Sequence, residues 1–193
     1  MTELIEEKEP YANMVTGLFK TEGFHSNHNA LMHAAIGICG EVGELIEAVD
    51  VDDSIKCRQN VVEELGDIHF YMVALELVTI HSPHYKRNEL LPNNPTFSPG
   101  NSKSLLLSLS VESSNILDIV KKGWVYGKDI DLVKLLDAAA IVIYLIGTLA
   151  ERLKISTDEI LEANRIKLTG KGGRYENGYT DQAAQGRADK VGE

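Results

Sequence analysis

Apolar side chains recur at helical spacing in two long runs of the N-terminal half of the chain. The first run, between residues 29 and 51, places them at Ala34, Ile38, Val42, Leu45, Ile46 and Val49. The second run, between residues 54 and 79, places them at Val61, Val62, Leu65, Ile68, Tyr71 and Met72. This spacing predicts one long helix over each run, with one face of each helix buried.

Carboxylates lie beside both apolar faces, in two pairs with the same spacing. The first predicted helix carries Glu41 and Glu44, and the second carries Glu64 and Asp67. Because residues three apart lie on neighbouring turns, each pair forms a short acidic stripe. Four carboxylates in a partly buried place would repel one another unless cations lay between them. Such oxygen ligands suit Mg²⁺, or Mn²⁺ in its place, so the sequence predicts a metal-binding helical hairpin.

Either pair alone would indicate only a solvated helix face, but the two together resemble a known family. They read His33-Ala-Ala-Ile-Gly-Ile-Cys-Gly-Glu-Val-Gly-Glu44 and then Val61-Val-Glu-Glu-Leu-Gly-Asp67. This pattern resembles the MazG-like branch of the all-α nucleoside triphosphate pyrophosphohydrolases. The resemblance extends to Asn164-Arg-Ile-Lys167 and to the tail from Gly178 to Lys190, which looks most like phage-borne members.

The resemblance implies an all-α fold in which helical hairpins pack into four-helix bundles. It implies that the four carboxylates of the two pairs bind Mg²⁺ and are the catalytic residues. It also implies that a nucleoside triphosphate is hydrolysed to a nucleoside monophosphate and diphosphate. Asn164 and Lys167, three apart on a further helix predicted from Ser156 or Thr157 to about Leu168, resemble the family's phosphate or sugar contacts.

An internal repeat relates residues 103–150 to the first hairpin. The segment from Ser110 to Asp118 follows that from Cys39 to Glu47, and Val133 to Asp137 follows Glu63 to Asp67. We therefore expect a second helical hairpin, so that one chain can build the four-helix unit internally.

Half of the metal ligands are missing from the second hairpin. Glu112 and Asp137 retain carboxylates at the positions of Glu41 and Asp67. Asn115 replaces one glutamate of the first hairpin, and Lys134 replaces another. We predict that this degenerate copy cannot hold a metal cluster by itself.

A basic and aromatic segment, Lys121-Lys-Gly-Trp-Val-Tyr-Gly-Lys128, joins the helices of the second hairpin. It resembles the basic loop of phage-type relatives, whereas residues 50–56 of the first hairpin are acidic. We predict that Lys121, Trp124 and Lys128 contact the nucleotide. Ordinary surface lysines and a tryptophan that serves only to anchor packing remain alternatives.

The remaining segments are predicted from local signals. Tyr11 to Phe19 favours a short helix, and residues 81–102 hold most of the prolines and form a linker. Residues 170–174 end the last helix, and the polar tail beyond is predicted to be extended or mobile, with Arg174 and Tyr175 as further candidates for substrate binding.

The residues around the two acidic pairs lead to further predictions. Glycines among the carboxylates indicate close approach of another helix or of a ligand, at Gly40, Gly43 and Gly66. Small or aromatic residues beside them are interpreted as packed core residues rather than ligands, namely Cys39, His33 and His69.

Composition limits the possible partners and location. The chain has 193 residues, room for one domain over 1–193, and its formal net charge of −10 argues against a nucleic-acid polymer or an anionic membrane. The stretch from Ala138 to Ala150 is shorter than the roughly 20 residues of a membrane span and predicts a core helix. No signal-peptide pattern and no disulfide spacing are found, which fits a bacterial or phage-infected host cytoplasm.

The sequence thus predicts a homodimeric, Mg²⁺-dependent nucleotide pyrophosphohydrolase that acts in nucleotide-pool control. The homodimer is expected because the apolar faces are too extensive for a slim bundle to cover. Two alternatives remain: a non-catalytic helical module that binds metal or a basic partner, and a pyrophosphohydrolase of another nucleotide derivative.

Overall fold

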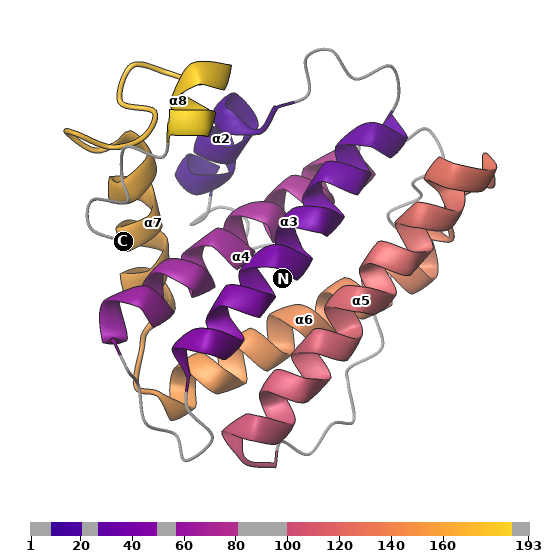
Figure 1. The fold of residues 1–193 in the computed structure, drawn as a ribbon, viewed down its shortest axis with the longest axis horizontal. Helices are drawn as coiled ribbons and strands as arrows, with labels where there is room; N and C mark the ends of the chain where they lie inside the picture. Colours follow the sequence, from indigo (N-terminus) through magenta and orange to yellow (C-terminus); the bar gives the residue numbers. More distant parts are fainter. Residues whose placement is uncertain (1–8, 21–26, 50–56, 81–99, 187–193) are drawn as a thin grey trace.

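The structure, a computed structural model, describes residues 9–20, 27–49, 57–80 and 100–186. These residues form helices joined by turns, and this part of the chain contains no β-strand (Figure 1). The predicted all-α class is therefore confirmed. The predicted linker over residues 81–102 lies mostly outside the described residues, as does the acidic segment over residues 50–56.

The first hairpin consists of α3 (Asn27–Ala48) and α4 (Arg58–Ile80). Both helices lie close to the predicted ranges, and both bury the apolar positions that predicted them. The buried side chains of α3 include Ile38, Val42 and Leu45, and those of α4 include Leu65 and Ile68. Each helix therefore turns one apolar face into the core, as the helical spacing requires.

The second hairpin consists of α5 (Ser102–Tyr126) and α6 (Leu132–Arg152). The side chain of Asn101 accepts a hydrogen bond from the backbone N–H of Ser104 and caps the start of α5. α5 ends at Gly127, whose φ of 61° lies in the left-handed region that glycine adopts at low cost. Asp131 caps α6 by accepting from the N–H of Lys134.

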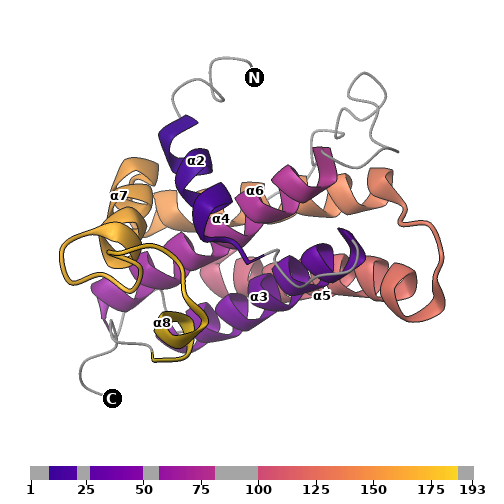
Figure 2. The same cartoon turned by 90° about the horizontal axis from the view of Figure 1, so that it is seen from above.

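The two hairpins pack against each other as a four-helix unit within one chain. α3 contacts both α4 and α5, α5 contacts α6, and α4 also contacts α6 (Figure 2). Their buried faces form one core, whose fully buried large side chains are Ile38, Leu45, Leu65, Ile68, Leu75, Leu105, Leu109, Ile116, Leu135, Leu145, Ile146 and Leu149. At the contact of α3 with α5, the thiol of Cys39 donates to the carbonyl oxygen of Ser113 at 3.2 Å, so this cysteine is packed as predicted.

Helix α6 is long and apolar enough, by length and composition, to cross a membrane. Core helices of globular proteins pass the same test. One face of α6 is buried in the common core through Leu135, Val142 and Leu149, whereas Val133 and Ile143 on other faces are exposed. One face of α6 is therefore part of the core, as predicted, whereas other faces leave apolar side chains exposed in the single chain.

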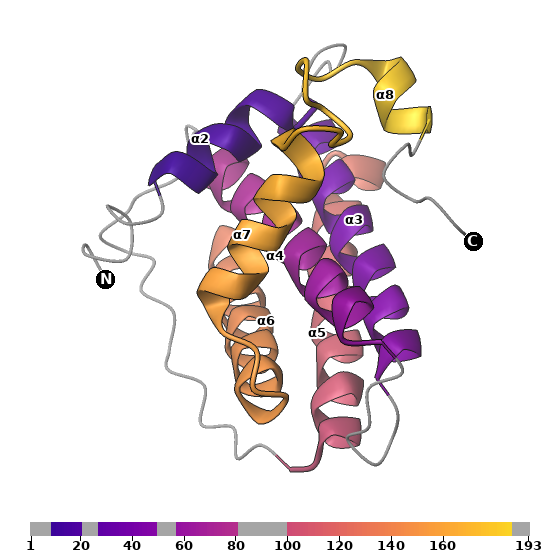
Figure 3. The same ribbon diagram turned by 90° about the vertical axis from the view of Figure 1, so that its left-hand side faces the viewer.

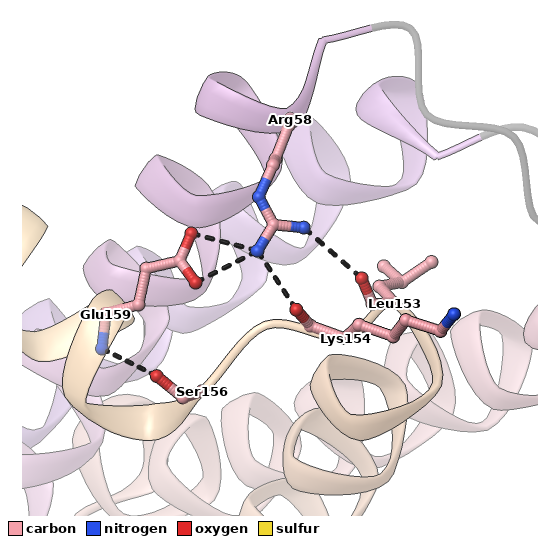
Figure 4. Close-up of polar contacts among 5 residues, drawn as sticks. All are labelled: Arg58, Leu153, Lys154, Ser156 and Glu159. Carbon is pink, nitrogen blue, oxygen red and sulfur yellow. Dashed lines mark hydrogen bonds and ion pairs between the residues drawn. The ribbon is translucent and has the colours of Figure 1, made fainter.

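Helix α7 (Thr157–Thr169) lies along α4 (Figure 3). Ser156 caps it by accepting from the N–H of Glu159, which confirms the predicted start. The guanidinium of Arg58, at the start of α4, donates to the carbonyl oxygens of Leu153 and Lys154 at 3.3 and 3.0 Å (Figure 4). Arg58 also pairs with Glu159 at 2.9 Å, so one side chain ties α4 to the turn that leads into α7.

Helix α2 (Glu9–Leu18) crosses α4 and contacts α7 (Figure 3), close to the range predicted for a short helix. Together, α2 and α7 therefore lie against the first hairpin.

The predicted end of the helix at residues 170–174 is confirmed, because α7 ends at Thr169, but the prediction of an extended or mobile tail beyond is wrong for residues 175–186. The backbone N–H groups of Arg174 and Tyr175 donate to the carbonyl oxygens of Lys167 and Leu168, which turns the chain back onto α7. A short helix, α8 (Asp181–Gly186), follows, and Lys20 pairs with Asp181 at 2.6 Å. The polar composition concealed this order because backbone hydrogen bonds and turns, rather than apolar burial, fold the segment.

Candidate metal centre

Three carboxylates meet between the helices of the first hairpin. Glu41 comes from α3, and Glu64 and Asp67 come from successive turns of α4. One oxygen of each lies within 4.8 Å of the others, a spacing at which they could hold one metal ion. The side chain of Glu64 is buried, with 7 % of the residue exposed, and the other two are half-buried. We call Glu41, Glu64 and Asp67 the carboxylate group.

The negative charges of Glu41, Glu64 and Asp67 repel one another when all three side chains are ionised. Burial, together with the neighbouring carboxylates, raises the pKa of both Glu41 and Glu64. These two side chains hydrogen-bond to each other, so they titrate as a pair. Burial also raises the pKa of Asp67, although Lys167 opposes this. Without a cation between them, the three groups therefore do not all ionise readily at neutral pH.

Glu44, the fourth predicted ligand, lies at the edge of the carboxylate group. It is half-buried on α3, and its charge raises the pKa of both Glu41 and Glu64. Glu44 is not among the carboxylates whose oxygens lie within 4.8 Å of one another. The structure thus brings three of the four predicted ligands together and leaves Glu44 adjacent to them.

Asp67 is held at both oxygens by side chains from α7. The amide nitrogen of Asn164 donates to Oδ1 at 2.7 Å, and Nζ of Lys167 donates to Oδ2 at 2.6 Å. Lys167 also pairs with Glu63 at 2.6 Å. Burial would lower the pKa of Lys167, but the charges of Asp67 and Glu63 prevail and raise it. Lys167 therefore supplies positive charge directly beside the carboxylate group.

Asn164 is itself buried, with 1 % of the residue exposed. Its amide oxygen accepts a hydrogen bond from the hydroxyl of Tyr11 at 2.7 Å, and burial raises the pKa of that hydroxyl. Sequence reasoning missed Tyr11, because only the packing of α2 against α4 and α7 brings it here. Its place within a predicted helix gave no signal of this contact.

Two helix glycines make room for side chains around the carboxylate group. A Cβ on Gly66 would lie 2.8 Å from Cβ of Asn164, which confirms the predicted close approach at this glycine. A Cβ on Gly37 would lie 2.5 Å from the ring of Tyr71, a contact that was not predicted.

The prediction that another helix approaches Gly40 and Gly43 is wrong for the described ranges. Apart from the neighbouring residues and the nearby backbone of α3 itself, no atom described there lies within 4 Å of a Cβ built on either glycine. Both glycines face outward, because they lie on the exposed side of α3. Close approach of a ligand, the other explanation predicted for these two glycines, stays a prediction.

The histidines of the first hairpin are packed, as predicted. His33 stacks on Phe19 with ring centroids 4.6 Å apart and meets the edge of Tyr71 at 5.9 Å. Burial lowers the pKa of His33 and so favours its neutral form. Nδ1 of His69 lies 2.8 Å from the carbonyl oxygen of Leu65.

The candidate contacts from the second hairpin lie away from the carboxylate group of the same chain. The indole nitrogen of Trp124 donates to Oδ1 of Asn29, more than three helical turns, or about 18 Å, along α3 from Glu41. The prediction that the whole segment joins the two helices is wrong for Lys121 to Tyr126, which form the last turns of α5. Lys121 pairs with Asp118 at 3.0 Å, and Lys128 is exposed beyond the end of α5. Within one chain, this segment therefore does not line the carboxylate group. It could contact a nucleotide bound at that group only if the group belonged to another subunit.

The counterparts of the metal ligands in the second hairpin make local contacts. Oε2 of Glu112 accepts from the amide nitrogen of Asn115 at 3.1 Å, and Lys134 pairs with Asp131 at 3.0 Å. Among the described residues, the second hairpin contributes no carboxylate to a group with metal-binding spacing.

The folded tail brings two predicted contacts near the carboxylate group. The charge of Arg174 lowers the pKa of both Asp67 and Tyr71, so its guanidinium is close enough to act on them. The same guanidinium lies 6.0 Å from the ring centroid of Tyr175, which packs against Tyr179. Lys167 thus contacts Asp67 directly, and Arg174 and Tyr175 lie near the carboxylate group.

Comparisons with protein-family models, with curated proteins and with solved structures found no match to this chain.

Proposed function

We propose that this protein is a Mg²⁺-dependent pyrophosphohydrolase that converts a (deoxy)nucleoside triphosphate and water into the monophosphate and diphosphate. One observation carries the proposal: the carboxylate group, with oxygens from two packed helices within 4.8 Å of one another. A resemblance in the sequence motifs suggested the reaction, and the geometry supports the metal-binding part of it.

The side chains of the carboxylate group fit a hard divalent cation. Their oxygens are the ligands that Mg²⁺ prefers. Burial, and after it the neighbouring carboxylates, raise the pKa of Glu41 and Glu64, and a bound cation would offset both effects because it favours the charged forms. Glu41, Glu64 and Asp67 would hold the ion, with Glu44 beside them. A bound Mg²⁺ would lower the pKa of a coordinated water and offset the negative charge of the phosphates.

The neighbouring side chains fit the remaining needs of the reaction. One of the glutamates accepts the proton of the attacking water. Lys167 and Arg174 place positive charge where an anionic triphosphate would lie, and the ring of Tyr175 offers a surface for a base. The substrate would therefore meet cations and an aromatic ring on the side of the carboxylates that faces the tail.

A homodimer remains a further proposal. Five large apolar or aromatic side chains on α5 are at least half exposed in the single chain: Leu107 at 66 %, Val111 at 51 %, Trp124 at 54 %, Val125 at 50 % and Tyr126 at 65 %. Light scattering tests this directly, and a monomer would remove the proposal.

The decisive experiment measures diphosphate and monophosphate release from a panel of (d)NTPs and (d)NDPs with Mg²⁺. We expect release from at least one triphosphate and a loss of about 100-fold or more in Glu64→Gln, because a buried ligand is replaced by a neutral amide. Lys134→Gln, at the corresponding position of the second hairpin, is the matched control and should retain the rate within about twofold.

The alternatives predict different results from the same assay. A non-catalytic module would bind Mg²⁺ and release nothing from any nucleotide. A pyrophosphohydrolase of another nucleotide derivative would ignore the triphosphates but act on a nucleotide sugar or a phosphoribosyl nucleotide, and Glu64→Gln would abolish that activity.

A further inference from the structure

A chain of three side chains from three helices ends at the carboxylate group. The hydroxyl of Tyr11 on α2 donates to Oδ1 of Asn164 on α7 at 2.7 Å. The amide nitrogen of Asn164 donates in turn to Oδ1 of Asp67 on α4 at 2.7 Å. We call this the Tyr11–Asn164–Asp67 chain.

The direction of these hydrogen bonds is fixed by chemistry. An ionised carboxylate can only accept, so Asn164 must present its NH₂ group to Asp67. The hydroxyl of Tyr11 donates to the other end of the same amide and therefore favours that orientation. A flipped amide would set its oxygen against a carboxylate oxygen and would leave the NH₂ group facing the hydroxyl.

The surroundings leave Asn164 little freedom. The residue is 1 % exposed, and a Cβ on Gly66 would lie 2.8 Å from its own Cβ. Tyr11 is also buried, with 6 % of the residue exposed, and its hydroxyl lies 3.5 Å from the carbonyl oxygen of Gly66. Both partners are thus enclosed by helix backbone, and the amide of Asn164 is engaged at both ends.

We propose that Tyr11 and Asn164 are positioning residues, which hold the Asp67 carboxylate in the orientation that binds the divalent metal ion. Asn164 acts through Asp67 and does not contact the nucleotide, although its motif had suggested a substrate contact. The inference rests on the metal-binding part of the proposed function. Partners that hydrogen-bond to a metal ligand and fix its orientation commonly change metal affinity or activity 10- to 100-fold, in order of magnitude, when they are removed.

The test measures Mg²⁺ binding to the metal-free protein by calorimetry, without nucleotide. We expect Asn164→Ala to weaken binding about 10-fold or more, and Tyr11→Phe, which removes only the hydroxyl, to weaken it about three- to tenfold. Thr79→Val is the matched control: its hydroxyl is also buried, but bonds to the carbonyl oxygen of Leu75 within α4. This variant should bind Mg²⁺ as the wild type does.

A second measurement separates positioning from simple support of the fold. If the nucleotide is hydrolysed, Asn164→Ala at saturating Mg²⁺ should lower kcat and leave the KM for nucleotide nearly unchanged. A raised KM with unchanged Mg²⁺ affinity would show that Asn164 contacts the substrate and would overturn the inference. Lower thermal stability of Tyr11→Phe and Thr79→Val alike, with equal Mg²⁺ affinity in both, would also overturn it.

The inference and the proposed function can fail separately. Mg²⁺ binding that weakens in Tyr11→Phe, in a protein that hydrolyses no nucleotide, would support the positioning roles and reject the pyrophosphohydrolase. Hydrolysis by a Tyr11→Phe protein with undiminished Mg²⁺ affinity would do the reverse. A wild-type protein that binds no Mg²⁺ would overturn both.

Discussion

The two hairpins share an arrangement of helices and differ in what covers them. In the first hairpin, α2 and α7 lie against α4, and Glu64 at its centre is buried. In the second hairpin, Lys134 occupies the corresponding position, and its side chain is 74 % exposed. The carboxylate group thus lies in the hairpin that keeps all four acidic positions and that two further helices contact, whereas the second hairpin has lost two of those positions.

Carboxylates of the two hairpins also differ in the side chains that donate hydrogen bonds to them. Asp67 receives hydrogen bonds from Asn164 and Lys167 on α7. Glu112, the counterpart of Glu41, receives one from Asn115 on its own helix. Three predictions test this comparison, beginning with the largest expected effect.

The largest expected effect is a difference in the rate of nucleotide hydrolysis between two glutamine variants at corresponding positions of the two hairpins. Glu41→Gln should reduce nucleotide hydrolysis about 100-fold or more, because it removes a ligand from the carboxylate group. Glu112→Gln, at the corresponding position of α5, should stay within about twofold of the wild-type rate. Steady-state kinetics with saturating Mg²⁺ measure both, and similar losses in the two variants would contradict the difference drawn between the hairpins.

The stability of the metal-free protein should depend on pH because the carboxyl groups of Glu41 and Glu64 titrate in the folded state. The pKa values of Glu41 and Glu64 are raised in the folded state, so the native protein binds more protons than the unfolded chain above the ordinary carboxyl range. Their contribution to the free energy of unfolding therefore falls as pH rises. We expect the melting temperature of the metal-free protein to drop by several degrees from about pH 5 to about pH 8.

Two controls isolate the carboxylate group in that experiment. Glu64→Gln should flatten the pH dependence, because it removes one of the repelling charges. Added Mg²⁺ should restore stability at the higher pH, since it binds the ionised carboxylates of the folded state. A wild-type melting temperature that is constant over this range would contradict the raised pKa values.

Two helix glycines, one from each hairpin, give the smallest expected effects. Gly66→Ala should destabilise the protein by about 1 to 3 kcal/mol, since the new Cβ would overlap Asn164. Gly147→Ala on α6 should stabilise it by up to about 1 kcal/mol, because no described atom lies within 4 Å of a Cβ there and alanine favours a helix. Chemical denaturation measures both, and equal effects of one sign would contradict the packing of α7 against α4.

Local patterns predicted most of the helices and the position of the carboxylates. Helical spacing predicted α3 and α4 closely, the internal repeat predicted a second hairpin where α5 and α6 lie, and Ser156 with its acidic first turn predicted the start of α7. The close approach at Gly66 was predicted, but those at Gly40 and Gly43 were not found among the described residues, because both face outward. Periodicity within one helix shows which residues share a face, but not which neighbour covers that face.

The amino-acid sequence by itself determined the all-α class and the acidic pairs, because both depend on spacing along a single helix. Only the tertiary structure decided which carboxylates meet, since that depends on how helices distant in sequence pack together. It placed Tyr11 and Asn164 behind Asp67, left Glu44 at the edge of the group and folded the tail over α7. These contacts join residues far apart in the chain, and packing alone brings them within hydrogen-bond distance.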